Sequence, residues 1–241
     1  MGNQTEPRTY QVKCVNPLEF HYMTVRELGE PDNPDVILCV HGLTRNGHDF
    51  DMIARELAND YRVVIPDLVG RGASDWLTDK SYYKYEQYVS DLTTLIAHLG
   101  VQEVDWLGTS LGGTIAFELA WRNNQPIRKL VCNDIGPYLR KELVERIAFF
   151  TGSTPLFNSR QEIKEYLQKI YAAFGNLTDE QWDHIAEHTT GKQEGSKWRL
   201  AFDPATAYSL VEEFDGKDKD QWPYWDKIRC PTLVIHGKDS I

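Results

Sequence analysis

Gly108-Thr109-Ser110-Leu111-Gly112 is the stretch of sequence that decides the fold, because it is a G-x-S-x-G pentapeptide between a strand-like run and a helix-like run. Residues 104–107 before it are strand-like, and residues 114–120 after it are helix-like. A serine on so tight a turn is held in a strained backbone with its hydroxyl exposed, while the glycines let strand and helix approach closely. The pattern therefore predicts a nucleophile at Ser110. The alternative is an ordinary turn of small residues with an N-cap serine.

The rest of the chain alternates apolar strands with helices. Further strands are expected at 9–15, 21–28, 35–42, 61–67 and 129–133. The runs at 35–42 and 61–67 are continuously apolar, which is typical of strands buried on both faces of a parallel sheet. Residues 82–99 carry apolar side chains at helical spacing, and Gly100 is expected to end that helix. This order predicts an α/β fold with a mostly parallel sheet and right-handed crossovers.

The texture changes after Pro137. From about residue 138 to residue 222 the sequence reads as helices without buried strands, and strand character returns only at 230–237. We therefore predict an α/β core formed by residues 1–137 and 223–241, with residues 138–222 inserted as a helical cap.

The chain resembles the α/β-hydrolase family over essentially its whole length. Besides the pentapeptide, the resemblance is carried by the turn Val40-His41-Gly42-Leu43-Thr44, the loop 66–74, the strand exit Asn133-Asp134-Ile135-Gly136-Pro137 and the stretch 225–237. It implies the α/β-hydrolase fold, a mostly parallel sheet flanked by helices, together with the inserted cap of the cap-bearing serine hydrolases.

The residues also predict a mechanism. Ser110 would attack a carbonyl carbon to form an acyl-enzyme, and it needs a base, normally a histidine held by a carboxylate. The oxyanion needs preorganised donors, and the backbone N–H of Leu111 lies at the start of the helix that follows the nucleophile. The resemblance implies the backbone N–H of Leu43 as the second donor.

Two aspartates compete for the role of the orienting carboxylate. The family commonly places the acid three residues after the glycine that ends the seventh strand, but Ser240 occupies that position here and Asp239 lies one residue earlier. Some members use a carboxylate after the sixth strand, which corresponds to Asp134. Asp134 can also be interpreted as a turn residue beside Gly136.

None of the seven histidines fits the position of the base. The family carries it on a loop after an eighth strand, whereas this chain ends at Ile241. His41 and His236 directly precede strand-ending glycines, which favours a structural or pocket-lining role. We therefore expect a fragment that lacks the last strand, the histidine loop and the final helix, and that has low stability and little activity by itself. His184 and His188 are one helical turn apart, and without a carboxylate or third ligand nearby they are interpreted as a polar helix face.

These observations predict a serine hydrolase that cleaves carboxylic esters or related acyl bonds of a small apolar substrate. The alternatives are a C–C bond hydrolase or a lactonase of the same fold, or a non-catalytic ligand-binding or degenerate member. Arg45 and Arg71 lie on loops near the expected site, where they would either meet a substrate carboxylate or be solvated at the surface.

Composition narrows the partners. A formal net charge of −10 argues against nucleic acid or an anionic membrane, and no apolar stretch approaches the length of a bilayer span. The four cysteines are far apart and are expected to be reduced in the core of a cytoplasmic protein. No metal, nucleotide or flavin motif is present, so neither a cofactor nor a metal is expected. Oligomeric state is not predicted.

Overall fold

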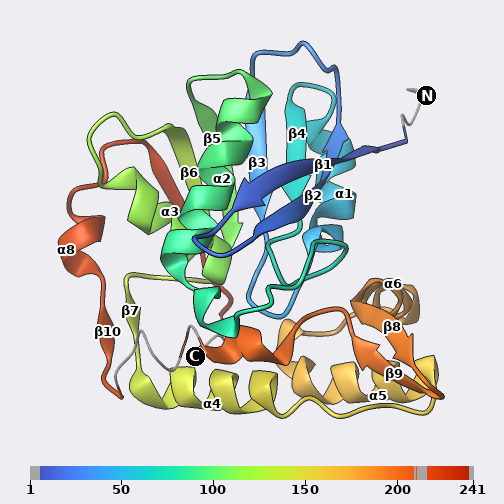
Figure 1. Cartoon of the computed structure of the whole chain (residues 1–241). Coiled ribbons are helices and arrows are strands. Elements are labelled where there is room, and N and C mark those ends of the chain that lie inside the picture. Colours follow the sequence, from blue (N-terminus) through green and yellow to red (C-terminus); the bar gives the residue numbers. More distant parts are fainter. Residues whose placement is uncertain (1–5, 209, 211–215, 239–241) are drawn as a thin grey trace.

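A seven-stranded sheet forms the centre of the molecule (Figure 1). The computed structural model describes residues 6–208, 210 and 216–238. The strand order is β1 (Arg8–Val15), β2 (Phe20–Leu28), β4 (Arg62–Pro66), β3 (Val36–Val40), β5 (Val104–Thr109), β6 (Ile127–Asn133) and β11 (Thr232–Ile235). The pairs β1–β2 and β2–β4 are antiparallel, and all pairs from β4 to β11 are parallel. The predicted mostly parallel α/β sheet is confirmed.

Helices cover both faces of this sheet, because successive side chains of a strand point to opposite faces. In β3, Leu38 belongs to the large core shared with α2 (Tyr85–Leu99) and α3 (Leu111–Ala120). Its neighbour Ile37 belongs to a smaller core on the other face, which contains Phe50 of η1 (Gly47–Phe50) and Ala54 of α1 (Asp51–Leu57). Complete burial of β3 thus explains its continuous apolar sequence.

The helix expected at 82–99 is present, with a small shift at its start. A short turn of 3-10 helix, η2 (Lys80–Tyr82), precedes α2, which begins at Tyr85. Gly100 ends α2 in the left-handed conformation with φ 71°, as predicted for a C-terminal glycine.

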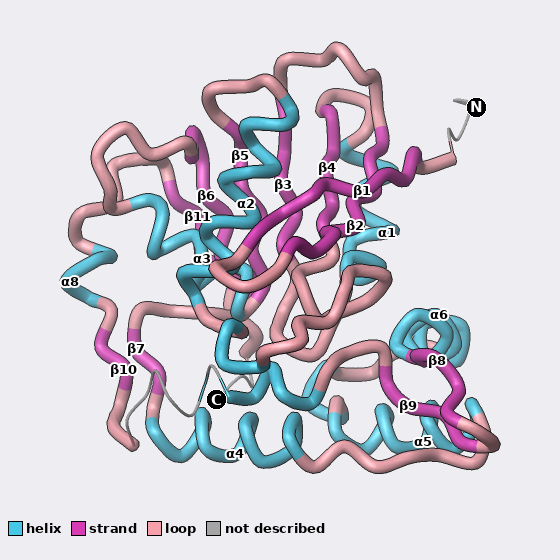
Figure 2. Tube along the Cα trace, viewed as in Figure 1, coloured by secondary structure: helices cyan, strands magenta, loops and turns pink. Residues whose placement is uncertain are grey.

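Residues 138–222 form a separate layer along one end of the sheet (Figure 1). Its elements are α4 (Lys141–Gly152), α5 (Arg160–Ile170), η3 (Ala172–Phe174), α6 (Asp179–Thr189), β8 (Thr190–Glu194), β9 (Lys197–Leu200) and η4 (Pro204–Ala207). The layer expected to be helical also contains a hairpin, formed by β8 and β9 (Figure 2). The hairpin turns at Gly195, which has a positive φ of 59°, and its Leu200 packs into a small core with Ile163 and Leu167 of α5.

Both ends of this layer return to the sheet side by side. The short strand β7 (Tyr138–Leu139) pairs with β10 (Lys219–Asp220), and α8 (Trp222–Trp225) leads on to β11. All four residues of β11 are exposed, at the end of the strand order. Among the described residues, no helix has the length and apolar character that a bilayer span requires.

Candidate active site

Ser110 makes the turn from β5 into α3 in a strained backbone conformation. Its φ and ψ are 50° and −112°, a region that costs a non-glycine residue about 1–3 kcal/mol. The turn is held from both sides: the Ser110 N–H donates to Asn133 O at 3.1 Å, and the Ser110 carbonyl accepts from the N–H groups of Gly113 and Thr114. The sharp strand-to-helix turn expected from the pentapeptide is therefore present.

The glycines of the pentapeptide are required by space. A Cβ on Gly108 would lie 2.4 Å from Gly112 O, and a Cβ on Gly112 would lie 2.0 Å from Val40 O. Both contacts are with backbone atoms, which cannot move aside as a flexible side chain can. Helix α3 thus rests directly on β3 and β5, and any larger residue would push it away from the sheet.

The two expected oxyanion donors lie on either side of Ser110. Leu111 is the first residue of α3, where an N–H has no acceptor within the helix. Gly42, the residue before Leu43, packs against Ser110, since a Cβ placed on it would lie 3.6 Å from Ser110 Cβ. No acceptor in the described part of the chain takes the N–H of either leucine. Both groups are therefore available to a substrate oxygen, although their roles remain predictions.

His41 is a structural histidine. Its Nε2 accepts a hydrogen bond from the Leu68 N–H at 2.9 Å, so its proton is on Nδ1, which donates to Gly42 O at 2.7 Å. The ring is completely buried, and this burial lowers its pKa to about 4 although Asp67 opposes the shift. A neutral imidazole with both nitrogens engaged ties the turn after β3 to the loop after β4.

Arg71 and Arg45 are both buried, which corrects their expected placement at the mouth or the surface. The Arg71 guanidinium is completely inaccessible and donates to Leu43 O, Val69 O and the Tyr88 hydroxyl at 2.7–2.8 Å. It therefore holds the loop that carries the Leu43 N–H. The guanidinium of Arg45 pairs with Asp49, and its Nη1 donates to the Thr189 hydroxyl at 3.0 Å. Both cations are consumed by internal contacts.

Asp67 is a bracing residue that sequence reasoning did not single out. Its carboxylate accepts from the N–H groups of Gly47 at 2.7 Å and Ala73 at 2.8 Å, and its carbonyl accepts from the Ser74 hydroxyl. Gly72 lies so close that a Cβ on it would meet the carboxylate at 2.2 Å. The D-x-x-G-x-G-x-S pattern of residues 67–74 is thus the local signal for a loop folded around a buried carboxylate.

Asp134 follows β6, the strand paired with the one that leads to Ser110. Thr109 at the end of β5 is paired with Asn133 at the end of β6, and Asn133 is paired with Ile235 of β11. Asp134 has a positive φ of 53°, and its Oδ1 accepts from the Gly237 N–H at 3.3 Å. Asp239, the other predicted acid, lies outside the described residues.

The histidines are distributed away from the Ser110 hydroxyl. His236 follows β11, which β6 separates from β5, and its Nδ1 lies 3.5 Å from Asp134 Oδ1. His98 is exposed on α2 against Tyr10. His21 belongs to a buried cluster with Asp91, and His48, His184 and His188 belong to a second cluster at α6. Within the described residues, no histidine hydrogen-bonds to the Ser110 side chain.

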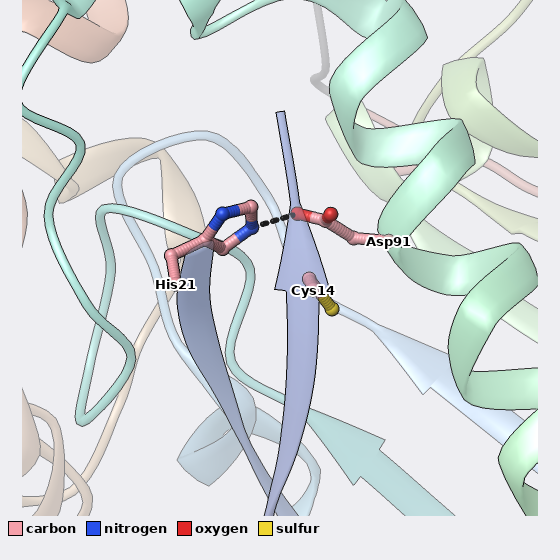
Figure 3. Close-up of side chains that lie close together, drawn as sticks. All are labelled: Cys14, His21 and Asp91. Carbon is pink, nitrogen blue, oxygen red and sulfur yellow. Dashed lines mark hydrogen bonds and ion pairs between the residues drawn. The ribbon is translucent and has the colours of Figure 1, made fainter. Parts of the chain in front are cut away.

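A buried polar cluster lies between the β1–β2 hairpin and α2 (Figure 3). His21 Nε2 is 2.9 Å from Asp91 Oδ2, and Cys14 lies beside them, all at most 2 % exposed. Cys14 and His21 are direct partners across the hairpin, which places both side chains on the same face. Burial raises the pKa of the Cys14 thiol to about 12, so this cysteine is protonated and unreactive.

The fold described above agrees with a comparison of the sequence against known families. A family model for the α/β hydrolase fold matches residues 35–241. The chain belongs to the α/β-hydrolase family.

Relatives of this α/β hydrolase include enzymes. A 3-hydroxybutyrate-oligomer hydrolase of Cupriavidus necator is 43 % identical over 241 residues, covering 97 % of this chain and 82 % of the relative. A solved structure from Rickettsia typhi is 33 % identical with a TM-score of 0.86, covering 97 % of this chain and 82 % of that one. An α/β hydrolase from Novosphingobium aromaticivorans is 28 % identical with a TM-score of 0.80, covering 99 % and 86 %. The chain is a hydrolase.

The contact between Gly112 and Val40 predicts the effect of one methyl group. Gly112→Ala should destabilise the protein by about 3 kcal/mol, because the added Cβ overlaps a backbone oxygen. It should also displace the Leu111 N–H and lower activity. Gly136→Ala is the matched control, since a Cβ there meets nothing within 4 Å, and it should change stability by less than about 0.5 kcal/mol. Urea unfolding measures both. Equal stability of the two variants would show that α3 is not pressed against β3.

Proposed function

We propose that this chain hydrolyses carboxylic esters through an acyl-enzyme on Ser110. The observation that carries the proposal is the strained turn at Ser110, against which Gly42 packs; Leu111 directly follows Ser110, and Leu43 directly follows Gly42. A positive φ at a serine is costly, and such strain persists where the surrounding structure enforces it at a functional site. Serine rather than aspartate at this position supports acyl transfer over alkyl-enzyme chemistry.

The substrate class follows from the relative in Cupriavidus necator. At 43 % identity over almost the whole chain, its named activity supports short oligomers of 3-hydroxybutyrate as the ester substrate here. An oligomer of this kind is a row of small ester units with a methyl branch, in agreement with the small acyl substrate expected from the sequence.

Residues 138–222 are proposed to act as the cap over this site, because they bind the loops that surround Ser110. The loop after β4 joins them through two backbone hydrogen bonds, from Gly72 N–H to Ala201 O at 2.7 Å and from Asp203 N–H to Gly70 O at 2.8 Å. The loop after β3 joins them through Thr44, whose hydroxyl lies 2.9 Å from the Tyr171 hydroxyl. These contacts support a layer that roofs the carboxyl ends of the strands.

Asp134 is proposed as the carboxylate that orients the base. Its backbone is fixed by the hydrogen bond from its N–H to Ile235 O at 2.7 Å, and it follows the strand beside the nucleophile. Its positive φ is uncommon for a residue with a side chain, although aspartate adopts it more readily than serine does.

The base is proposed to be none of the seven histidines of this chain. His41 has both nitrogens engaged inside the protein, and His236 is an exposed residue beyond Asp134.

The first prediction concerns the nucleophile. In the complete gene product, Ser110→Ala should lower the kcat for 3-hydroxybutyrate trimer by about 10⁴-fold or more, because the acyl-enzyme cannot form. Release of monomer followed by chromatography measures the rate. Ser90→Ala, at an exposed serine of α2, is the control and should retain full activity. A fluorophosphonate probe should label the parent protein and the control but not Ser110→Ala; hydrolysis that survives this substitution contradicts the proposal.

The second prediction separates the two acids. Asp134→Asn should reduce kcat by about 10³–10⁴-fold in the complete gene product, because the base loses the carboxylate that holds its tautomer. Asp239→Asn should leave kcat within about threefold. The reverse outcome would assign the acid to Asp239.

The third prediction concerns the base. The isolated chain 1–241 should be labelled slowly by the fluorophosphonate, and added imidazole should accelerate labelling of Ser110 by supplying a base. Ser110→Ala controls for reaction elsewhere. The proposal is wrong if imidazole does not accelerate labelling of the chain and His236→Ala abolishes that labelling. In that case His236 is the base.

A further inference from the structure

Three histidines and one aspartate meet where α6 lies against the core, away from Ser110. His48 and Asp51 come from η1 and the start of α1, and His184 and His188 come from the last two turns of α6. The pair on α6 was interpreted from the sequence as a polar helix face, because no carboxylate or third ligand was near it. The fold brings the carboxylate of Asp51 and the ring of His48 next to this pair, so the assumption behind that interpretation was wrong.

The ligand atoms of this cluster converge. Those of His48, Asp51 and His188 lie within 4.8 Å of one another. His48 Nδ1 is 2.8 Å from Asp51 Oδ2, and His184 Nε2 is 3.6 Å from the same oxygen. His184 Nε2 donates to His48 O at 3.1 Å, so His184 joins as a ligand only when it releases that hydrogen bond. Ligands of one zinc ion are about 2.0–2.2 Å from the metal, so these atoms are close enough to share one ion once the rings turn toward it.

The carboxylate is presented to the histidines in a fixed orientation. Arg26 Nη1 donates to Asp51 Oδ1 at 2.5 Å, which leaves Oδ2 directed toward the imidazoles. The proximity of Arg26 opposes a cation, but the carboxylate lies between the guanidinium and the three rings. Asp51 is mostly buried, with 14 % of its side chain exposed.

The His188 ring has no protein partner for its nitrogens. Within the described residues, no hydrogen bond reaches either of them, whereas its backbone carbonyl accepts from Asn46 Nδ2 at 2.7 Å. The unprotonated ring nitrogen of a histidine is the atom that binds a metal, and at His188 no described protein group occupies it.

The rings are packed as three imidazoles with one anion. His48 and His188 are stacked with centroids 3.6 Å apart and an interplanar angle of 9°, and the His184 ring meets His188 edge-on at 4.6 Å. Repulsion between stacked rings would follow if both gained protons. A divalent cation would instead be bound by the ring nitrogens and by the carboxylate.

We propose that His48, Asp51 and His188 bind a divalent transition-metal cation, with His184 as a further ligand. Imidazole and carboxylate ligands suit zinc, cobalt, nickel and copper. For the ion to bind, His48 carries its proton on Nε2, so that the Nδ1 lone pair and Asp51 Oδ2 both face the cation with no net loss of a proton, and the stacked rings rotate apart to face the ion. Because two ligands come from the core and two from α6, the ion fastens residues 138–222 to the sheet.

The alternative metal site is a second group of three possible ligands, Cys14, His21 and Asp91 (Figure 3). There Asp91 already accepts hydrogen bonds at both oxygens, one from Gln87 Nε2 at 2.6 Å and one shared with His21. All three side chains lie in the apolar core, where an unpaired divalent charge is most costly. The experiment must still distinguish the two sites.

Zinc binding by the untagged protein is the test. Isothermal titration with ZnCl₂ should show one site per chain, and both His188→Ala and His48→Ala should weaken binding by about tenfold or more. His98→Ala, at an exposed histidine of α2, should bind zinc as the parent does. Zinc should also raise the midpoint of thermal unfolding of the parent and of His98→Ala, but not of the other two variants.

Cobalt substitution of the unaltered protein provides a measurement that does not depend on variants folding. The visible d–d bands of bound Co²⁺ should appear and then disappear on addition of Zn²⁺, without a sulfur-to-cobalt charge-transfer band in the near ultraviolet. A charge-transfer band would place the ion on Cys14 and overturn the proposal. The proposal also fails if zinc binds no more tightly to the parent than to His48→Ala.

Discussion

The contact between the Val40 carbonyl and Gly112 is the constraint on which the candidate site depends. There is no room for a methyl group between β3 and the first turn of α3, since a Cβ on Gly112 would lie 2.0 Å from that oxygen. The chain must therefore leave β5 and enter α3 within a single residue. Ser110 takes the whole change of direction in its own backbone, and this is what lifts its side chain clear of the sheet.

The loops around Ser110 are held from behind by polar groups that never reach the substrate. A neutral His41, a buried Arg71 and a buried Asp67 each satisfy backbone groups from loops after β3 and β4. Buried polar groups are stable only when their hydrogen bonds are made, so each one fixes the course of the loops it joins. The result is a rigid base beneath the N–H of Leu43, built from atoms that a study of the pocket alone would not include.

Local signals predicted the strand-to-helix turn at Ser110, the succession of strands along the chain and the end of α2, because each depends on residues that are adjacent in the chain. The burial of Arg45 depends on Thr189, which is 144 residues away, and periodicity carries no information about such a partner. The hairpin of β8 and β9 was missed because its strands are short and flank an exposed turn rather than a continuous apolar run. His184 and His188 were recognised as a pair, but their aspartate lies more than 130 residues earlier, on the core.

The pairing of β7 with β10 has a consequence for how this enzyme can diversify. Leu139 pairs with Lys219, and the Gln221 N–H donates to Pro137 O at 2.7 Å, so about eighty residues leave and re-enter the sheet through one small opening. An insertion whose ends already touch can be lengthened, shortened or replaced without altering the spacing of the strands on either side. The layer between these two strands can therefore be exchanged as a unit between members of the family. Such an exchange would be a direct route to new substrate preferences on an unchanged sheet.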